Sequence, residues 1–254
     1  TVIGQIIAAI LALVFNLKCN RELNISMKGF RPNGHLMVQI YKVGAPSIVV
    51  QAIGSLMTYG MNLILAAFGS AQTVFGIYFK LQSFVFMPVF GLNNGMVPII
   101  AYNYGAGHKD RVIKTIKHSV AYGVGIMFVG LLAMHIFPAQ LMRMFDAEES
   151  LIAIGAPALE TISLSFVFAG FCIVAGSVFQ ALGNGVYSMI VSVARQMCVL
   201  LPVAKLLSLS GEVTLIWWAF PIAELASVLL TSYFLVRIYR KVICHIGEPV
   251  VQDA

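Results

Sequence analysis

The sequence predicts an all-α polytopic membrane protein, and three observations lead to that prediction. Hydrophobic residues make up 59% of the 254 residues, and charged residues make up only 10%. Soluble domains carry about 25% charged residues. The mean hydropathy is +0.90, and long apolar windows alternate with short charged loops. Such a chain folds as a bundle of spanning helices, because lipid leaves each helix to satisfy its own backbone polar groups.

About 20 apolar residues cross the hydrocarbon core of a bilayer, and the chain contains seven segments long enough, or nearly long enough, to do so. In order they are Thr1–Leu17, Val43–Phe68, Gln72–Tyr104, Ile116–Phe137, Leu151–Leu182, Val186–Leu207 and Val213–Ile238. The first is short, and we interpret residues 1–17 as the end of a transmembrane helix of a longer protein. Residues 18–42 are then a basic loop, residues 43–238 a bundle of six complete helices, and residues 239–254 a tail.

Charged residues or glycine turns bound each segment in turn. The first segment ends before Lys18, the second begins after Lys42, and the fifth follows Glu148-Glu149. Gly105-Ala106-Gly107 and Gly183-Asn184-Gly185 predict tight turns, because glycine readily adopts positive φ. Neither turn follows a strand or carries a Lys-Ser/Thr pair, so a phosphate-binding loop is excluded.

Lysine and arginine gather in alternate loops. The loop after the first segment, the loop after the third and the C-terminal end hold twelve of the 16 basic residues. The positive-inside rule places these three regions in the cytoplasm, and we expect a multi-pass membrane protein. The run His108–Ser119 has an apolar face, and we expect it to lie in the membrane interface. Charge distributed in this way indicates topology and lipid contact, so nucleic-acid binding is excluded.

One segment combines helix breakers with amides. Gln72–Tyr104 contains Asn93-Asn94 together with four residues that weaken a helix, namely Pro88, Gly91, Gly95 and Pro98. Freed backbone groups are tolerated in a membrane only where protein or a water-filled cavity satisfies them. We therefore predict an interrupted helix, hinged at these four residues, beside a transport path.

Four charged residues lie deep in four different segments. Lys80, Glu160, Arg195 and Glu224 are eight to eleven residues from a segment end, or about 12–16 Å, in a core about 30 Å thick. An unpaired charge there costs at least about 2.5–3.5 kcal/mol. We predict that all four face inward and include at least one close opposite-charge pair. Two roles stay open: a structural clamp, or a coupling group that exchanges its partner, for which Glu160 and Glu224 are the acidic candidates.

Amide side chains complete the set of candidate substrate or coupling residues. They are Gln51, Asn62, Gln82, Asn93, Asn94 and Gln180. A buried amide needs partners, which a polar cavity, a substrate or a neighbouring helix supplies. The sequence contains no metal-ligand spacing, nucleotide fingerprint or nucleophile–base pair, so we expect no cofactor, no metal and no enzyme.

Three stretches resemble a known family. The run MPVFGLNNGMVPIIAYNYGAGHKDRV from Met87 to Val112 is similar to the eighth helix and following loop of the multidrug and toxic compound extrusion (MATE) family. Phe179–Pro202, with Gln-Ala-Leu-Gly and Arg195-Gln196, and Trp217–Glu224 resemble later helices of that family. The chain looks like the C-terminal half of a bacterial inner-membrane member, helices seven to twelve preceded by the end of helix six. The resemblance thus makes residues 1–17 the end of a helix from the N-terminal lobe, residues 18–42 the inter-lobe loop, and residues 43–238 the C-terminal transport lobe.

The resemblance implies a twelve-helix antiporter of two six-helix lobes, whose partner here is the missing N-terminal lobe. It implies export of small amphipathic, often cationic compounds in exchange for H⁺ or Na⁺. Many members have an essential carboxylate in the first helix, and some have one in helix seven, but Val43–Phe68 contains no Asp or Glu. Two alternatives stay open: a flippase of the same superfamily that moves a lipid-linked saccharide, and a membrane scaffold subunit that transports nothing.

Overall fold

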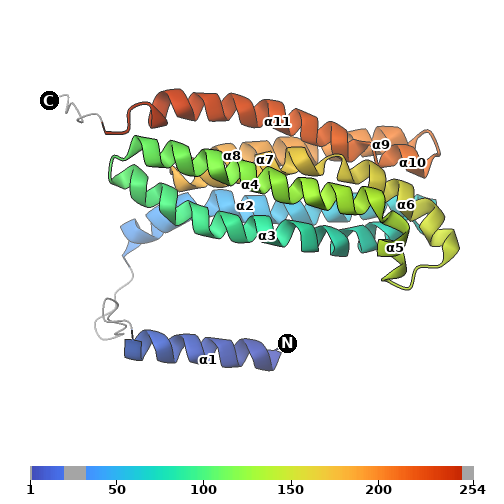
Figure 1. Ribbon diagram of the computed structural model, residues 1–254, viewed down its shortest axis with the longest axis horizontal. Coiled ribbons are helices and arrows are strands. Elements are labelled where there is room, and N and C mark those ends of the chain that lie inside the picture. Colours follow the sequence, from blue (N-terminus) through green and yellow to red (C-terminus); the bar gives the residue numbers. More distant parts are fainter. Residues whose placement is uncertain (1, 20–32, 248–254) are drawn as a thin grey trace. The chain divides into compact units, whose positions relative to one another are not determined.

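A computed structural model describes residues 2–19 and 33–247. The chain divides into two units, Thr1–Tyr41 and Lys42–Ala254, and the described residues of both contain helices and turns but no strand (Figure 1). The elements are α1 (Val2–Cys19), α2 (Gly34–Leu65), η1 (Ala66–Phe68), α3 (Ala71–Gly105), α4 (Lys109–Ile136), α5 (Pro138–Arg143), α6 (Glu149–Ser163), α7 (Phe166–Ala181), α8 (Gly185–Val193), η2 (Ala194–Leu200), α9 (Leu201–Ser208), α10 (Val213–Ile216), α11 (Ala219–Ile238) and η3 (Tyr239–Ile243).

The second unit contains the six complete spans that the sequence predicts, so the predicted fold class is confirmed. Five spans are long enough and apolar enough to cross a membrane, and a bent helix pair supplies the sixth. The spans are Gly44–Phe68, Ala71–Gly105, Lys109–Ile136, the pair Glu149–Ser163 and Phe166–Ala181, Gly185–Ser208, and Val213–Ile243. Helix α2 begins at Gly34, nine residues before Val43, where the sequence predicts the start of the second segment.

The span formed by α6 and α7 is broken, where the sequence predicts one segment, Leu151–Leu182. Helices α6 and α7 meet at an angle of 49°. At the break, the Ser165 hydroxyl and the Ser165 amide both donate to the carbonyl of Ile162, at 2.6 and 3.0 Å. The Ser163 hydroxyl donates to the carbonyl of Glu160. Serine side chains that bond to nearby carbonyls compete with the helical ladder, which explains a bend at this site.

Helix α3 deviates from its prediction in the opposite sense, because it is continuous where the sequence predicts an interruption. The predicted interruption is wrong at the level of the backbone, because α3 runs without a break through Pro88 and Pro98. The irregular turn lies instead in η2, a π-helix, where the Leu201 amide bonds to the carbonyl of Gln196, five residues back. Pro202 follows and has no N–H to continue the normal ladder. Wide turns of this kind are frequent at functional sites.

The basic run His108–Ser119 does not lie as a separate interfacial turn. It forms the first turns of α4, which continues to Ile136, so the prediction of an in-plane segment is wrong. Val112 and Ser119 are buried, and the Lys109 ammonium donates to the Cys244 carbonyl at 2.8 Å. Packing of the apolar face and this bond hold the start of α4 against the end of the last span.

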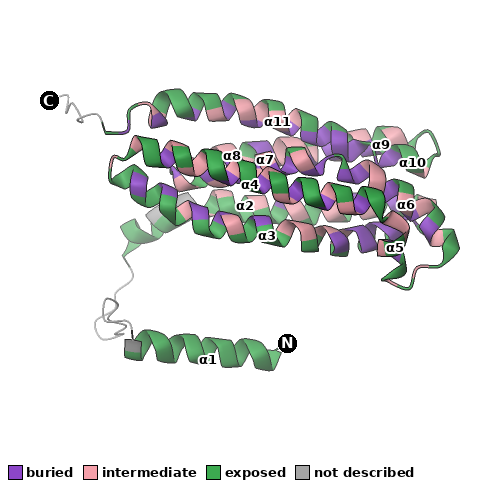
Figure 2. Cartoon of the chain, in the orientation of Figure 1, coloured by how far each residue is buried: buried purple, intermediate pink, exposed green. Residues whose placement is uncertain are grey.

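Small residues set the closest helix contacts in the lobe. Buried residues concentrate between α3, α4, α7 and α11, whereas the outer helix faces are exposed (Figure 2). Gly123 on α4 faces Gly170 on α7: a Cβ built on Gly170 lies 3.1 Å from the Gly123 carbonyl oxygen. Helices in membranes associate through such small-residue contacts, because apolar burial gives them no driving force in lipid.

Replacing Gly170 by Ala is expected to destabilise the lobe by about 1–3 kcal/mol, because the added methyl meets a backbone carbonyl that cannot rotate away. Gly176→Ala on the same helix is the matched control, since its Cβ lies 4.0 Å from the nearest atom, on Ser188. Thermal unfolding in detergent measures both variants. Equal midpoints for the two would contradict the close approach of α4 and α7.

Candidate functional site

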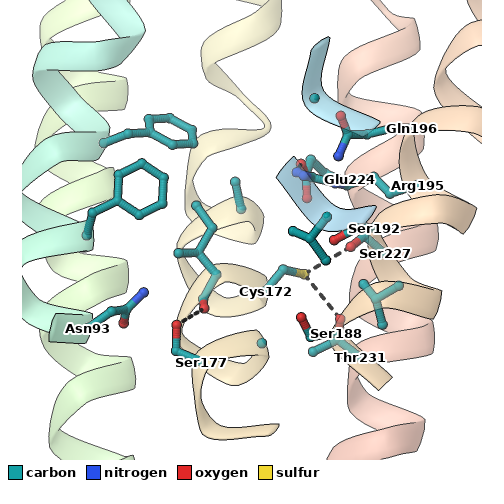
Figure 3. A pocket seen from close by; sticks show the side chains of 18 of the residues that line it. Asn93, Cys172, Ser177, Ser188, Ser192, Arg195, Gln196, Glu224, Ser227 and Thr231 are labelled. Carbon is teal, nitrogen blue, oxygen red and sulfur yellow. Dashed lines mark hydrogen bonds and ion pairs between the residues drawn. The ribbon is translucent and has the colours of Figure 1, made fainter. Parts of the chain in front are cut away.

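A cavity of about 720 Å³ lies within the second unit, between α2, α3, α7, the α8–η2 region and α11 (Figure 3). Five of the six spans therefore contribute to its wall. Its polar lining residues are Ser47, Gln51, Tyr78, Gln82, Asn93, Asn94, Ser165, Cys172, Ser177, Gln180, Ser188, Ser192, Arg195, Gln196, Glu224, Ser227 and Thr231. A cavity so rich in hydrogen-bonding groups inside an apolar lobe is a place for a polar ligand or water.

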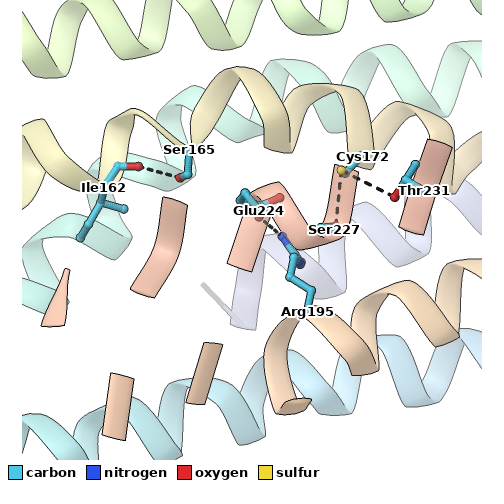
Figure 4. A network of polar contacts seen from close by, with 7 residues as sticks. All are labelled: Ile162, Ser165, Cys172, Arg195, Glu224, Ser227 and Thr231. Atoms are coloured by element: carbon cyan, nitrogen blue, oxygen red, sulfur yellow. Dashed lines mark hydrogen bonds and ion pairs between the residues drawn. The ribbon is translucent and has the colours of Figure 1, made fainter. Parts of the chain in front are cut away.

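An ion pair joins two walls of this cavity. Arg195 on η2 donates from Nη1 to Oε1 of Glu224 on α11 at 2.5 Å (Figure 4). The side chains are 26% and 9% exposed, respectively. The predicted close opposite-charge pair is thus confirmed. The second carboxylate oxygen, Oε2 of Glu224, is buried and has no hydrogen-bond partner among the described residues.

A thiol and two hydroxyls form a second polar cluster beside the pair. The hydroxyls of Ser227 and Thr231 on α11 donate to Sγ of Cys172 on α7, at 3.4 and 3.6 Å (Figure 4). Ser227 and Thr231 are buried, so the weak sulfur acceptor satisfies hydroxyls that would otherwise have none. The cluster links α7 to the helix that carries Glu224.

Amides line the other parts of the cavity. Asn93 on α3 lies across it from Arg195 and Glu224 (Figure 3). Asn93 is 6% exposed, and its Oδ1 has no donor among the described residues. The Gln180 amide donates to the Ser188 hydroxyl at 3.1 Å. Because a buried carbonyl-type oxygen without a donor is costly, Asn93 supplies an acceptor site for a ligand or water.

The structure brings together most of the residues that the sequence singles out. Arg195, Glu224, five amides and one proline line the cavity, the amides being Gln51, Gln82, Asn93, Asn94 and Gln180, and the proline Pro98. Pro88, Gly91 and Gly95 belong to the same helix but do not line the cavity. Asn62 instead donates to the carbonyl of Thr58 at 2.9 Å.

Two of the four midplane charges lie elsewhere. Lys80 is exposed, with its ammonium 5.6 Å from the centroid of the Phe145 ring, so the prediction that it faces inward is wrong. The contact with an aromatic face is a favourable place for a cation outside the lobe interior. Glu160 is half-buried on α6, and no described cation pairs with its carboxylate.

Sequence reasoning missed the small hydroxyls that line the cavity, of which Ser227 and Thr231 are buried. A signal was present in the spacing. Ser188, Ser192 and Arg195 are four and three residues apart, and Glu224, Ser227 and Thr231 are three and four apart. Residues at these spacings share one helix face, so a search for polar stripes around the two deep charges finds them.

The lining combines polar groups with an aromatic wall. Phe79, Phe86, Phe90 and Phe220 line the cavity together with the amides and hydroxyls. Among the described residues, no group of three His, Cys, Asp or Glu side chains could hold a metal ion. The arrangement can stack a flat ligand on rings, bond its polar groups, and place a proton or small cation on Glu224.

The fold and the cavity define a polytopic helical membrane protein with a polar, partly aromatic cavity inside a six-span lobe. The MatE family model matches residues 46–206, well over half of the chain, and the chain belongs to this family. The resemblance found in the sequence is thereby confirmed.

Relatives and solved structures agree with this assignment. The chain is 25% identical to Multidrug export protein MepA of Staphylococcus haemolyticus over 95% of its own length, and 27% identical to MepA of Staphylococcus aureus strain MSSA476 over 88%. It covers 53% and 49% of those proteins, so it spans about half the length of the curated relatives that it matches. The structure of the MATE multidrug transporter DinF-BH superposes with a TM-score of 0.82 at 32% identity, over 94% of this chain and 54% of that one. A MATE in the straight conformation has the same fold, with a TM-score of 0.82 at 17% identity, over 96% of this chain and 55% of that one.

The Arg195–Glu224 pair predicts strong non-additivity. Arg195→Met and Glu224→Gln are each expected to lower stability, Arg195→Met by about 3 kcal/mol, because it leaves a buried carboxylate without its cation. The double variant should lose less stability than the two single variants lose together, since it leaves no uncompensated charge. Thermal unfolding of the four proteins in detergent measures this, and additive losses would show that the two groups do not interact.

Proposed function

We propose that this chain is one lobe of a secondary active multidrug exporter, which moves amphipathic, often cationic compounds out of the cell by H⁺- or Na⁺-coupled antiport. The single observation that carries the proposal is the polar, aromatic-walled cavity with a carboxylate in its wall. The exporter names of the relatives support it. The second lobe completes the path, and the two lobes rock against each other around a site near the midplane.

Glu224 is our candidate for the coupling group. A coupling carboxylate must exchange its proton or cation during the cycle. One oxygen of Glu224 pairs with Arg195, and the other is buried without a partner among the described residues. That second oxygen can take a proton or a small cation while the pair with Arg195 persists. Glu160 lies outside the cavity lining. A coupling role for Glu160 therefore stays a prediction from the sequence alone.

The proposal is tested in proteoliposomes that contain the full-length protein carrying this chain. Efflux of an amphipathic fluorescent cation is measured under an imposed H⁺ or Na⁺ gradient, for wild type, Glu224→Gln and Glu160→Gln. We expect Glu224→Gln to lose at least about tenfold in gradient-driven efflux, because the amide cannot exchange a proton. Glu160→Gln makes the same change on α6 and tests the second acidic candidate, which lies outside the cavity lining.

The outcomes separate the two roles left open for the ion pair. Loss of efflux in a Glu224→Gln protein that still inserts and folds supports a coupling role for this carboxylate. Normal efflux in both variants leaves Glu224 as the structural partner of Arg195 and assigns coupling to the other lobe. No efflux from wild type opposes the exporter and favours the flippase. The lining of the cavity disfavours the flippase. A lipid phosphate needs a free cation, but Arg195, the one lysine or arginine among the described lining residues, is already paired with Glu224.

The hinge role proposed for Pro98 generates a second prediction. Proline has no N–H, so Pro98 leaves the Asn94 carbonyl without its helical donor, and both residues line the cavity. Pro98→Ala is expected to restore that bond and stiffen α3. Transport should fall severalfold while the unfolding temperature stays equal or rises. A loss of stability that parallels the loss of transport would contradict a hinge at this position.

Topology belongs to the same proposal. The positive-inside pattern places the α3–α4 turn and the C-terminal end in the cytoplasm. The bond between Lys109 and the Cys244 carbonyl supports a common side for these two regions.

A further inference from the structure

A groove between α3 and α4 lies apart from the cavity and takes no part in the proposed transport site. It encloses about 620 Å³. One wall comes from α3 and includes Gly91, Gly95 and Ile99, and the other comes from α4 and includes Arg111, Lys114 and His118. The groove shares no lining residue with the cavity.

The two walls form a gradient of polarity along the membrane normal. Arg111, Lys114 and His118 are three and four residues apart on one face of α4, and α4 begins at Lys109. They therefore lie within about 14 Å of the helix end. Gly91 lies about 21 Å from the end of α3 at Gly105. The groove is thus cationic at the end of the spans and apolar deeper in the membrane.

The cations at this end are available to a ligand. No described carboxylate forms an ion pair with Arg111 or Lys114. His118 bonds through Nδ1 to the Lys114 carbonyl at 2.7 Å; because a carbonyl only accepts, Nδ1 donates this bond. Lys109 is already engaged by the Cys244 carbonyl.

A buried acceptor lines the groove beside these cations. Asn103 is 8% exposed and lies two residues before the end of α3. Its Nδ2 donates to the Ile99 carbonyl at 2.8 Å, but its Oδ1 has no donor among the described residues. A ligand that offers a hydroxyl next to its negative charge satisfies this oxygen.

Glycines keep the deeper part of the groove open. A Cβ built on Gly91 or Gly95 meets no atom within 4 Å, so neither glycine is required there for helix packing. Because Gly91 and Gly95 carry no side chains, these two positions leave room along α3 for a hydrocarbon chain. A soluble anion would use the cations but not this apolar wall.

We propose that the α3–α4 groove binds an anionic phospholipid whose headgroup carries hydroxyls, such as phosphatidylglycerol. The phosphate lies at Arg111 and Lys114, a headgroup hydroxyl donates to Asn103, and an acyl chain runs along Gly95 and Gly91. Basic pockets between spanning helices bind anionic headgroups by the same physics. Charge complementarity and the polarity gradient together select a lipid as occupant.

The test titrates the full-length protein in phosphatidylcholine nanodiscs with phosphatidylglycerol and counts bound lipid by native mass spectrometry. Arg111→Gln/Lys114→Gln is expected to bind phosphatidylglycerol about thirtyfold more weakly, at about 1 kcal/mol per basic residue near an anionic headgroup. Lys117→Gln/Lys241→Gln removes the same charge from exposed positions outside the groove and should bind as wild type does. Gly95→Leu should weaken binding by filling the acyl path, whereas Gly76→Leu, also unobstructed on α3, should not.

Each outcome decides the proposal. Selective loss in the Arg111/Lys114 variant, with binding kept in the Lys117/Lys241 variant, supports a built headgroup site. Equal loss in both double variants indicates diffuse surface charge, and no loss in either indicates that another part of the protein covers the groove; both results overturn the proposal. Glycerol 3-phosphate that displaces the lipid at millimolar concentration, together with unchanged binding in Gly95→Leu, would identify a soluble-anion site instead.

Discussion

One constraint determines how the helices of this lobe are arranged: a polar group without a partner in an apolar environment costs free energy. Lipid offers no hydrogen bonds to a charge or an amide, so such side chains must turn toward one another or toward a cavity. Arg195 and Glu224 meet this demand by pairing across two helices, and the hydroxyls of Ser227 and Thr231 meet it by donating to Cys172. These contacts hold α7, η2 and α11 around one space. The polar cavity is the geometric result of that constraint.

Not every demand is met inside the protein: four buried side-chain atoms among the described residues lack a hydrogen-bond partner, and three of them line the cavity or the groove. Glu224 and Asn93 each keep one buried oxygen without a partner among the described residues, and both line the cavity. Asn103 does the same at the α3–α4 groove. Buried polar atoms are rarely left unsatisfied in folded proteins. Substrate, coupling ion, water or lipid are therefore natural partners for these atoms, and the two sites differ in which partner their surroundings favour.

Helix irregularity follows the same physical reasoning. The bend between α6 and α7 occurs where two serine hydroxyls bond to carbonyls of the preceding turn. The π-turn of η2 precedes a proline that cannot donate, and it presents Arg195 and Gln196 to the cavity. Helix α3, in contrast, absorbs two prolines without a break. Breaks are located by competing hydrogen bonds and neighbouring helices, and the number of proline and glycine residues is a poor guide to them.

Composition and patterning determined the class of this protein: long apolar windows fold as helices because lipid permits little else, and four deep charges require at least one pair. The amides Gln51, Gln82, Asn93, Asn94 and Gln180 were also identifiable, since polar side chains in spans need a polar environment. Only the tertiary structure decided which charges meet, because pairing depends on how helices rotate about their axes. Arg195 and Glu224 are 29 residues apart in the chain and meet, whereas Lys80 turns outward to Phe145. Helix rotation is set by small-residue contacts such as Gly123 with Gly170, and a single sequence carries no direct record of such long-range packing.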